Sequence, residues 1–265
     1  ASYCGIFGFK PTFGTIARTG VLKTADTLDT IGFFSNHLDD LKLIYNSVRH
    51  KGKNYPHIHK KFFTKKINFT KTDIIIAKII GPKSKNINSK LSIDYEIVTK
   101  KLSKISNIKI IEYKLPKLFD NAHYYHDLIY SKSLSYHLQK EFKNSPGKFS
   151  SSLKKMIIKG QRITNKSYDD ALEYQYKIID FLDKKFNKID FLIDLASFTT
   201  APKFGNNDVD DHNLIWTMGH IPVLSIPLDN SYNNLPFGLL LASKKFHDLK
   251  MIDFAKFIQK RIKYD

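Results

Sequence analysis

Apolar and polar positions along the chain alternate between two periods, and they predict interleaved strands and helices. Short apolar runs bounded by Gly, Pro or Asn are typical of strands, whereas apolar residues three or four positions apart are typical of helices. The predicted strands cover residues 7–11, 29–34, 73–80, 108–113, 189–195, 221–227 and 236–242. The predicted helices cover residues 38–48, 93–105, three segments between 118 and 186, 213–219 and 252–262. The pattern therefore predicts the α/β class, with a mixed β-sheet core covered by helices.

Local signals set some of the predicted boundaries. Asn36 precedes an apolar helical pattern and is the expected N-cap of its helix. The segments 144–147 and 164–167 are expected to divide the long helical region into three helices. Residues 51–71 are rich in lysine and histidine with little periodicity, so we expect an exposed loop there.

Composition indicates a globular chain. Hydrophobic residues make up 42% and aromatic residues 13% of the chain. These fractions are enough to bury a sizeable core. No apolar run approaches the ~20 residues that a membrane-spanning helix needs, so we expect no membrane partner. A single cysteine excludes an internal disulfide framework and fits a reducing compartment, and we therefore predict a cytoplasmic protein.

The formal charge of +18 raises the question of nucleic-acid binding. Arginine, the residue suited to bidentate phosphate and base contacts, stands only at positions 18, 49, 162 and 261. The remaining basic residues are lysines spread over the whole chain, as in a solvated surface. We therefore predict no specific nucleic-acid partner, with only a weak affinity for polyanions at low salt.

The first 14 residues, ASYCGIFGFKPTFG, carry the most specific motif. They resemble the segment that comes after the nucleophilic serine in the amidase signature family, whose pattern is G-G-S-I-R-x-P-A-x-x-C-G-x-x-G-x-K-P-T-x-G. Five positions of this chain, Gly5, Gly8, Lys10, Pro11 and Gly14, are the motif residues to which we assign a structural role. We expect the glycines to let backbone segments approach one another around the active-site wall.

Two further stretches are similar to the same family. TLDTIG (27–32) matches a segment that precedes a helix, and NLIWT (213–217), IPVLSIP (221–227) and LPFGL (235–239) match a C-terminal pattern. The chain also departs from the family. Phe33 replaces a usual proline, Asn36 a common arginine, His220 a frequent glycine and Leu240 a usual glutamine.

The resemblance implies a fold and a reaction. Residues 1–265 would form the C-terminal portion of one amidase-signature α/β/α domain, incomplete in this chain. The family's lysine, cis-serine and nucleophilic serine all precede the matched motif, so we assign no catalytic residue here. The parent protein would be a serine-dependent amidase that hydrolyses a carboxamide to an acid and ammonia or amine through an acyl-enzyme. We expect no cofactor, no metal and a small amide substrate, and the intact protein could form a homodimer.

Substrate-binding candidates come from the C-terminal motif and the helical region. Trp216 and Thr217 are the first candidates to line an acyl pocket, followed by Asp210, Tyr125 and Tyr130. A buried Trp in a helix is more often part of the core than a ligand contact, and this alternative applies to Trp216.

Other motifs carry little weight. Ser151–Lys154 matches S-x-x-K, but its partner motifs are absent and chance explains so short a pattern. His57 and His59 lack a third metal ligand at a suitable spacing, and His123 and His126 do not form H-E-x-x-H. Cys4, among glycines, is expected to be a small packed residue rather than a nucleophile.

Three hypotheses stay open. The favoured one is part of a stand-alone amidase. The second is the A subunit of a tRNA-dependent amidotransferase, which would need ammonia-channelling and nucleotide-dependent partners. The third is a non-catalytic remnant or binding module. For the isolated chain we predict no amidase activity and poor stability, because missing strands would expose apolar sheet edges.

Overall fold

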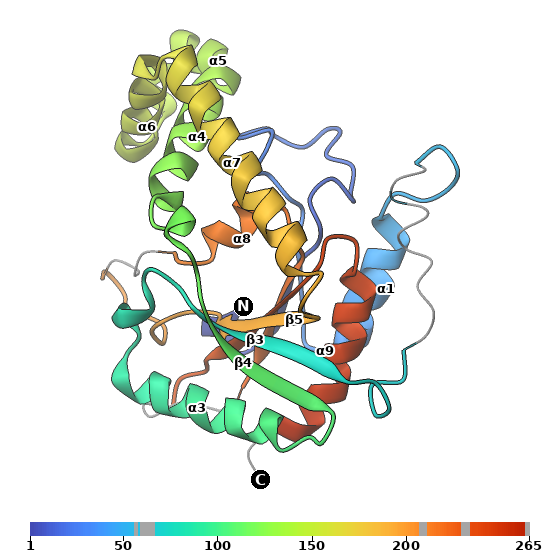
Figure 1. The fold of residues 1–265 in the computed structure, drawn as a ribbon. Helices are drawn as coiled ribbons and strands as arrows, with labels where there is room; N and C mark the ends of the chain where they lie inside the picture. The colour runs from blue at the N-terminus through green and yellow to red at the C-terminus, as the bar shows by residue number, and fades with distance from the viewer. Residues whose placement is uncertain (56–57, 59–66, 207–210, 229–233, 263–265) are drawn as a thin grey trace.

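A twisted seven-stranded sheet forms the centre of the computed structural model, which describes residues 1–55, 58, 67–206, 211–228 and 234–262 (Figure 1). The strands are β1 (Phe7–Lys10), β2 (Phe33–Ser35), β3 (Ile74–Ile80), β4 (Ile108–Lys114), β5 (Phe191–Leu195), β6 (Val223–Pro227) and β7 (Gly238–Ser243). The helices are α1 (Leu38–Val48), α3 (Ser89–Ser103), α4 (Ala122–His137), α5 (Gln139–Asn144), α6 (Ser151–Arg162), α7 (Asn165–Lys185), α8 (Leu214–Met218) and α9 (Asp248–Ile262).

The sheet is mixed, as predicted. Its strand order is β2-β1-β6-β7-β5-β3-β4. Strand β3 runs parallel to β4 and β5, and the other neighbours pair antiparallel. Strand β1 pairs with β6, with Phe9 opposite Leu224, so the N-terminal motif and the C-terminal motif lie side by side.

Helices cover both faces of the sheet and create two apolar layers (Figure 1). On one face α1, α3 and α9 pack through residues such as Tyr45, Val98 and Phe254. On the other face α4, α7 and α8 pack through residues such as Ile178 and Trp216. This three-layer α/β/α arrangement confirms the predicted class.

The far ends of α4 and α7 extend beyond the sheet and form a helical lobe with α5 and α6 (Figure 1). A small separate core of Leu134, Leu138 and Ile157 holds this lobe together. Gly160 permits the crossing of α6 over α4, because a Cβ at this position would overlap the carbonyl oxygen of Ser131 at 1.9 Å.

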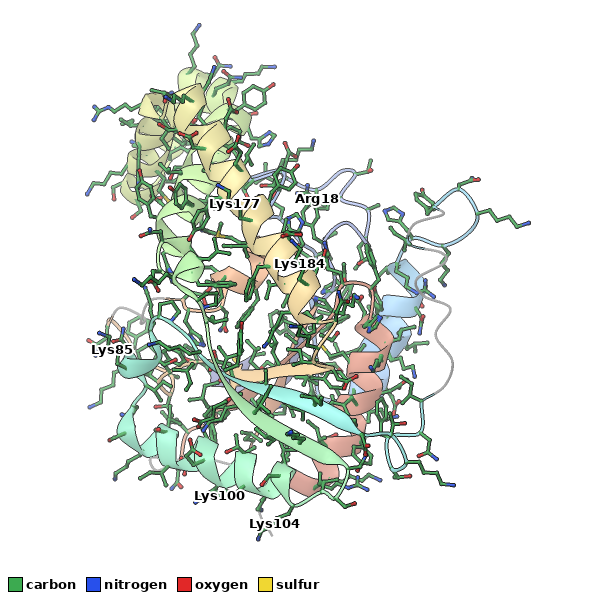
Figure 2. The ribbon with its side chains drawn as sticks, viewed as in Figure 1. Arg18, Lys85, Lys100, Lys104, Lys177 and Lys184 are labelled. Atoms are coloured by element: carbon green, nitrogen blue, oxygen red, sulfur yellow. The ribbon has the colours of Figure 1, made fainter. Side chains whose placement is uncertain are left out.

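Many lysines on the helices point away from the sheet. Figure 2 shows Lys100 and Lys104 at the end of α3, and Lys177 and Lys184 on α7, with their ammonium groups at the outer surface. Among the described residues, no helix is long and apolar enough to cross a membrane.

The structure corrects several predicted boundaries. Asn36 is not the N-cap of α1, because His37 occupies that position. Of the predicted strand 29–34, only Phe33 and Phe34 lie in the sheet, where β2 covers Phe33–Ser35. Asp29 instead fixes a loop, where its carboxylate accepts hydrogen bonds from the backbone of Thr24 at 2.9 Å and from Arg18 at 2.9 Å.

The helical region contains one more break than predicted. Leu138 separates α4 from α5, so four helices rather than three lie between residues 122 and 185. The Leu138 side chain packs in the core of the helical lobe. Because Leu138 is apolar, the sequence pattern continues through it and did not predict the break. Residues 56–57 and 59–66 of the expected 51–71 loop lie outside the described residues.

A buried polar contact fastens the N-terminal segment to the last helix. Asp248, at the first turn of α9, accepts hydrogen bonds from the Thr12 backbone nitrogen at 2.8 Å and the Thr12 hydroxyl at 2.7 Å. Both residues are fully buried. The contact fixes the end of β1, and with it the pocket described below.

Candidate functional site

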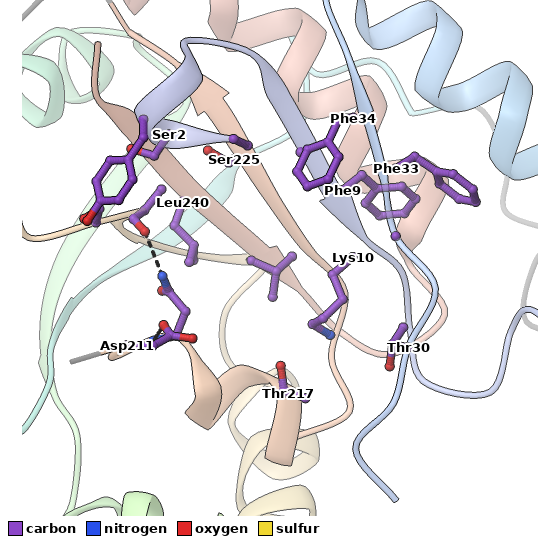
Figure 3. Close-up of a pocket in the computed structure, with 18 of the residues that line it drawn as sticks. Ser2, Phe9, Lys10, Thr30, Phe33, Phe34, Asp211, Thr217, Ser225 and Leu240 are labelled. Carbon is purple, nitrogen blue, oxygen red and sulfur yellow. Dashed lines mark hydrogen bonds between the residues drawn. The ribbon is translucent and has the colours of Figure 1, made fainter. Parts of the chain in front are cut away.

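A pocket of about 620 Å³ opens where β1 and β2 meet the chain's first residues and the segment entering α8 (Figure 3). Its apolar walls include Phe9, Phe33, Val223 and Leu240, with Phe34 at the sheet edge. Its polar lining includes Ser2, Lys10, Asp211, Asn213, Thr217 and Ser225. An apolar cavity with a few convergent polar groups is the usual form of a small-molecule site.

The N-terminal motif builds one wall of this pocket. Ala1, Ser2 and Tyr3 line it directly. Gly8 lets this segment lie close to β1, because a Cβ at Gly8 would stand 2.5 Å from the Ala1 methyl and 3.3 Å from the Phe34 ring. Gly14 has a different role, since its φ of +74° suits a turn and no atom crowds it within 4 Å.

Lys10 brings a cationic group into the pocket from β1 (Figure 3). Its ammonium donates to the carbonyl oxygen of Ile221 at 2.6 Å, the one hydrogen bond that it makes within the described part of the chain. Burial lowers the pKa of Lys10 to about 8, although the carboxylate of Asp248 acts in the opposite direction. A carbonyl dipole offsets only part of the cost of desolvating this charge.

The opposite polar group comes from the residues that enter α8. Asp211 accepts a hydrogen bond from the Asn213 backbone nitrogen at 2.8 Å, and the Asn213 side-chain nitrogen donates to the Ala196 carbonyl at 2.7 Å. His212 lies behind them, with Nε2 at 2.8 Å from the Leu195 carbonyl and its ring stacked on Phe198. Burial lowers the pKa of His212, which favours its neutral form.

Three buried polar atoms of the pocket residues have no hydrogen-bond partner among the described residues. They are the hydroxyl oxygens of Ser2 and Ser225 and the side-chain carbonyl oxygen of Asn213. Buried polar atoms are nearly always hydrogen-bonded in proteins, so these three atoms lack partners that a water, a ligand or another segment would supply.

His220, which stands where the family pattern often has glycine, packs behind the pocket. His220 adopts a φ of +59°, and its ring stacks on Phe13 at 4.1 Å between centroids. Glycine is favoured in this backbone conformation. The His220 Nε2 lies 2.8 Å from the Thr27 carbonyl. Burial lowers the pKa of His220 to about 4, so this ring is neutral around pH 7.

The predicted substrate-binding residues fall into different places. Thr217 lines the pocket. Trp216 is fully buried in the α4–α7–α8 layer behind it, and Tyr125 and Tyr130 pack against the same layer, away from the pocket lining. Asp210 lies outside the described residues. Contacts of these residues with a substrate stay predictions.

Sequence reasoning did not predict that four polar residues line the pocket, although it assigned one of them, Lys10, a structural role in the motif. Lys10 carried a usable signal, because a lysine between two apolar strand positions and a proline is an unusual place for a solvated charge. Asn213 belongs to the C-terminal motif, although its side-chain role was not predicted. Ser2 and Ser225 had no signal, since isolated serines are common and only the β1–β6 pairing brings their segments together. No group of three or more metal-ligating side chains occurs within the described residues.

The sheet, its covering helices and the pocket at the glycine-rich segment define an α/β/α protein with a small-molecule site. The family model named Amidase matches residues 1–252. The chain therefore belongs to the amidase family.

Individual relatives agree with this assignment. The chain is 27% identical to the A subunit of the glutamyl-tRNA(Gln) amidotransferase of Sulfolobus acidocaldarius, and the match covers 100% of this chain and 62% of the relative. A crystal structure of an amidase has a TM-score of 0.84 at 17% identity, covering 98% of this chain and 59% of that one. The A subunit of the glutamyl-tRNA(Gln) amidotransferase of Thermotoga maritima has a TM-score of 0.77 at 20% identity, covering 98% of this chain and 58% of that one. This chain thus spans less than two thirds of the length of these relatives.

Proposed function

We propose that this chain is the C-terminal part of a serine-dependent amidase, which hydrolyses a carboxamide to an acid and ammonia or amine through an acyl-enzyme. The observation that carries the proposal is the position of residues 1–3 on the pocket wall. In the family pattern the nucleophilic serine precedes Ala1 by only a few residues. A serine at that distance along the chain would lie next to this pocket.

The reaction would divide its parts between two segments. The serine, the cis-serine and the lysine that move its proton would come from the segment before Ala1, together with the backbone N–H groups that stabilise the oxyanion. The described residues would shape the pocket for the acyl or amide part of the substrate. Thr217 and the other polar lining residues would orient it there.

The experiment compares three proteins for ammonia release from simple aliphatic and aromatic amides. They are the 265-residue chain, the polypeptide translated with the codons upstream of Ala1, and that longer polypeptide with the recovered serine changed to alanine. The proposal predicts release only by the longer protein with its serine intact. Release by the 265-residue chain alone, or release that survives loss of the serine, would contradict it.

A second candidate function follows from the relatives. Several of the matching proteins are named as A subunits of glutamyl-tRNA(Gln) amidotransferases, so the parent could supply ammonia within such a complex. The same ammonia assay separates the two functions. A stand-alone amidase turns over simple amides without other subunits, whereas a subunit of this kind is expected to require partner proteins. A natural reading frame that starts at Ala1, with a product that releases nothing, would support a binding module instead.

A further inference from the structure

Lys10 is a partly buried residue with a desolvated ammonium, and no carboxylate is bonded to it within the described residues. The nearest influence of opposite charge is Asp248, but the oxygens of that carboxylate are held by the Thr12 backbone nitrogen and hydroxyl. The Lys10 ammonium carries three protons and, among the described residues, places one of them on Ile221. Two donors are therefore left for a group that enters the pocket.

Asn213 requires the opposite kind of partner. Its side-chain nitrogen is committed to the Ala196 carbonyl at 2.7 Å, which fixes the orientation of the amide. The buried side-chain oxygen then lacks a donor among the described residues. Because the neighbouring Asp211 carboxylate also faces the pocket, this end attracts N–H groups and repels anions.

Two hydroxyls that have no partner among the described residues add to the polar lining. Ser2 and Ser225 both lie against Gly238, where a Cβ would stand 3.3 Å and 2.8 Å from their oxygens. A hydroxyl can donate or accept, so these two oxygens suit either end of a polar ligand. The pocket thus has a cationic end on β1 and an acceptor end before α8, and Figure 3 shows Lys10 and Asp211 approaching it from these two elements.

From this arrangement we propose that the pocket binds a short amide that ends in a carboxylate. The carboxylate binds the ammonium of Lys10, and the amide N–H₂ donates to the side-chain oxygen of Asn213. The amide group of this ligand rests on the proposed amidase function. The inference adds that the substrate carries a carboxylate, and it names the residues that recognise that group. An ion pair in a partly desolvated pocket discriminates a charged ligand from a neutral one of the same length.

The test is calorimetric titration of the longer polypeptide, with its recovered serine changed to alanine so that neither probe is hydrolysed. The two probes have equal length and are succinamate and its neutral counterpart succinamide. At pH 7 we expect succinamate to bind at least tenfold more tightly. The preference should shrink above pH 8, where Lys10 loses its proton.

Other titratable groups act on Lys10 or line the pocket, and the pH series must be interpreted with them in mind. Asp248 of α9 and His220 after α8 interact electrostatically with Lys10, and Asp211 and His212 line the acceptor end. Burial lowers the pKa values of both histidines, so neither gains a charge between pH 7 and 9.5.

Two lysine variants make the test specific. Lys10→Met should remove the preference for succinamate, whereas Lys78→Met, which removes a buried lysine outside the pocket lining, should keep it. If Lys10→Met does not fold, the pH series on the protein with Lys10 intact decides. Equal binding of the two probes at pH 7, binding of neither, or a preference that persists at pH 9.5 would overturn the inference.

The ammonia assay keeps this inference separable from the proposed function. Serine-dependent hydrolysis of neutral amides without any preference for succinamate would leave the amidase standing and remove the carboxylate site. Selective binding of succinamate without hydrolysis would support the carboxylate site and contradict the amidase function.

Discussion

Each end of the sheet has a lysine that is removed from solvent, fully at Lys78 and partly at Lys10, and the partners of the two ammonium groups differ. At the β4 end, Lys78 is 8% exposed and donates to two carboxylates, Glu96 of α3 and Glu112 of β4, the latter at 3.2 Å. At the β1 end, Lys10 has a backbone carbonyl at 2.6 Å and no carboxylate bonded to it in the described structure.

The edge strands at these two ends differ in the same way. Strand β4 presents Lys109, Glu112 and Lys114 to solvent, and charged side chains keep an edge from pairing with other chains. Strand β2 presents Phe34, which is 67% exposed, beside the pocket. The β4 end therefore pairs its buried charge within this chain. Within the described residues, the β2 end has a lysine without a bonded carboxylate, buried polar atoms without partners and an exposed apolar side chain, which are features common at binding surfaces.

The largest expected effect concerns the contact that holds the pocket end to α9. Asp248→Ala removes the carboxylate that accepts hydrogen bonds from the Thr12 backbone N–H and hydroxyl, and it leaves the buried Thr12 N–H unpaired. We therefore expect a loss of about 3 kcal/mol in the free energy of unfolding, measured by urea denaturation. The control is Asp253→Ala on the same helix, which removes a partly exposed ion pair with Lys42. This control should cost less than about 1 kcal/mol. Equal losses would contradict this account of the pocket end.

Substitution of each of the two lysines, Lys78 and Lys10, tests the comparison directly. Lys78→Met removes the buried ammonium that binds two partly exposed carboxylates, Glu96 and Glu112. It should lower the free energy of unfolding at pH 7 by about 1 to 2 kcal/mol, measured by urea denaturation. Lys10→Met removes a desolvated charge that has no bonded carboxylate within the described residues, so it should not lower the free energy of unfolding at pH 7 and should raise it by about 1 kcal/mol. A larger loss from Lys10→Met than from Lys78→Met would reverse the comparison.

The pH dependence of stability tests the same comparison, because the pKa shift of Lys10 predicts the direction in which its contribution changes with pH. Burial lowers the pKa of Lys10 from 10.5 to about 8 in the folded chain, so the unfolded chain binds more protons between these values. The contribution of this group to stability therefore rises as pH increases from 8 to 10.5. Lys10→Met should lack this rise. A wild-type curve that falls over this interval, beside an Lys10→Met curve that does not, would show that Lys10 is not desolvated.

Asp194 on β5 is a buried titratable group without an ion-pair partner among the described residues, and unlike Lys10 it lies outside the pocket. It is 3% exposed, does not line the pocket, and accepts one hydrogen bond, from the Leu195 backbone nitrogen at 2.8 Å, within the described residues. Burial raises its pKa from 3.8 to about 8, so the folded chain holds the proton and avoids the charge.

The prediction for Asp194 has the opposite pH dependence from Lys10. Its contribution is fully present below pH 3.8 and is lost as pH rises through 8. Asp194→Asn, which resembles the protonated side chain, should be more stable than wild type at pH 8 by on the order of 1 to 2 kcal/mol and should lack this decline. Thermal unfolding at pH 5, 6.5 and 8 measures it. A variant less stable than wild type at pH 8 would mean that Asp194 has a charged partner.

The smallest effect on stability is expected at the apolar edge. The Phe34 ring is largely exposed, so Phe34→Lys should change little that is buried. We expect a change of less than about 0.5 kcal/mol in the free energy of unfolding. The variant should nevertheless reduce self-association of the isolated chain in light scattering, since a charge at an edge strand opposes pairing. Lys109→Phe on β4 is the reciprocal variant and should increase it. No change in either variant would show that the edges are equivalent.

Much of the fold could be predicted from the sequence. The apolar runs at 73–80 and 189–195 identified β3 and β5 because strands buried on both faces have continuous apolar patterns. The break at Leu138 could not be predicted, because its apolar side chain fits either a continuous helix or a turn into the lobe core. The N-cap was misplaced by one residue, since the Ser35 hydroxyl accepts from the His37 nitrogen at 3.1 Å and supports the start there.

The site could be predicted only in part. The motif of residues 1–14 located the pocket wall, because glycine positions and the lysine are fixed by sequence spacing. The strand order brings β1 beside β6, which comes from the far end of the chain, and this long-range pairing decides that Ser2 and Ser225 share a pocket. Trp216 was the first predicted pocket residue, yet helix α8 turns Thr217 to the pocket and Trp216 to the core.

The most direct test of the central claim is to trap the acyl-enzyme of the longer polypeptide with a slowly hydrolysed amide and locate the acyl group by peptide mass spectrometry. The account predicts one modified serine, in a peptide that precedes Ala1, and no acyl group on residues 1–265. Acylation of Ser2, Ser225 or any other residue of this chain would contradict the division between a catalytic segment and a chain that shapes the pocket.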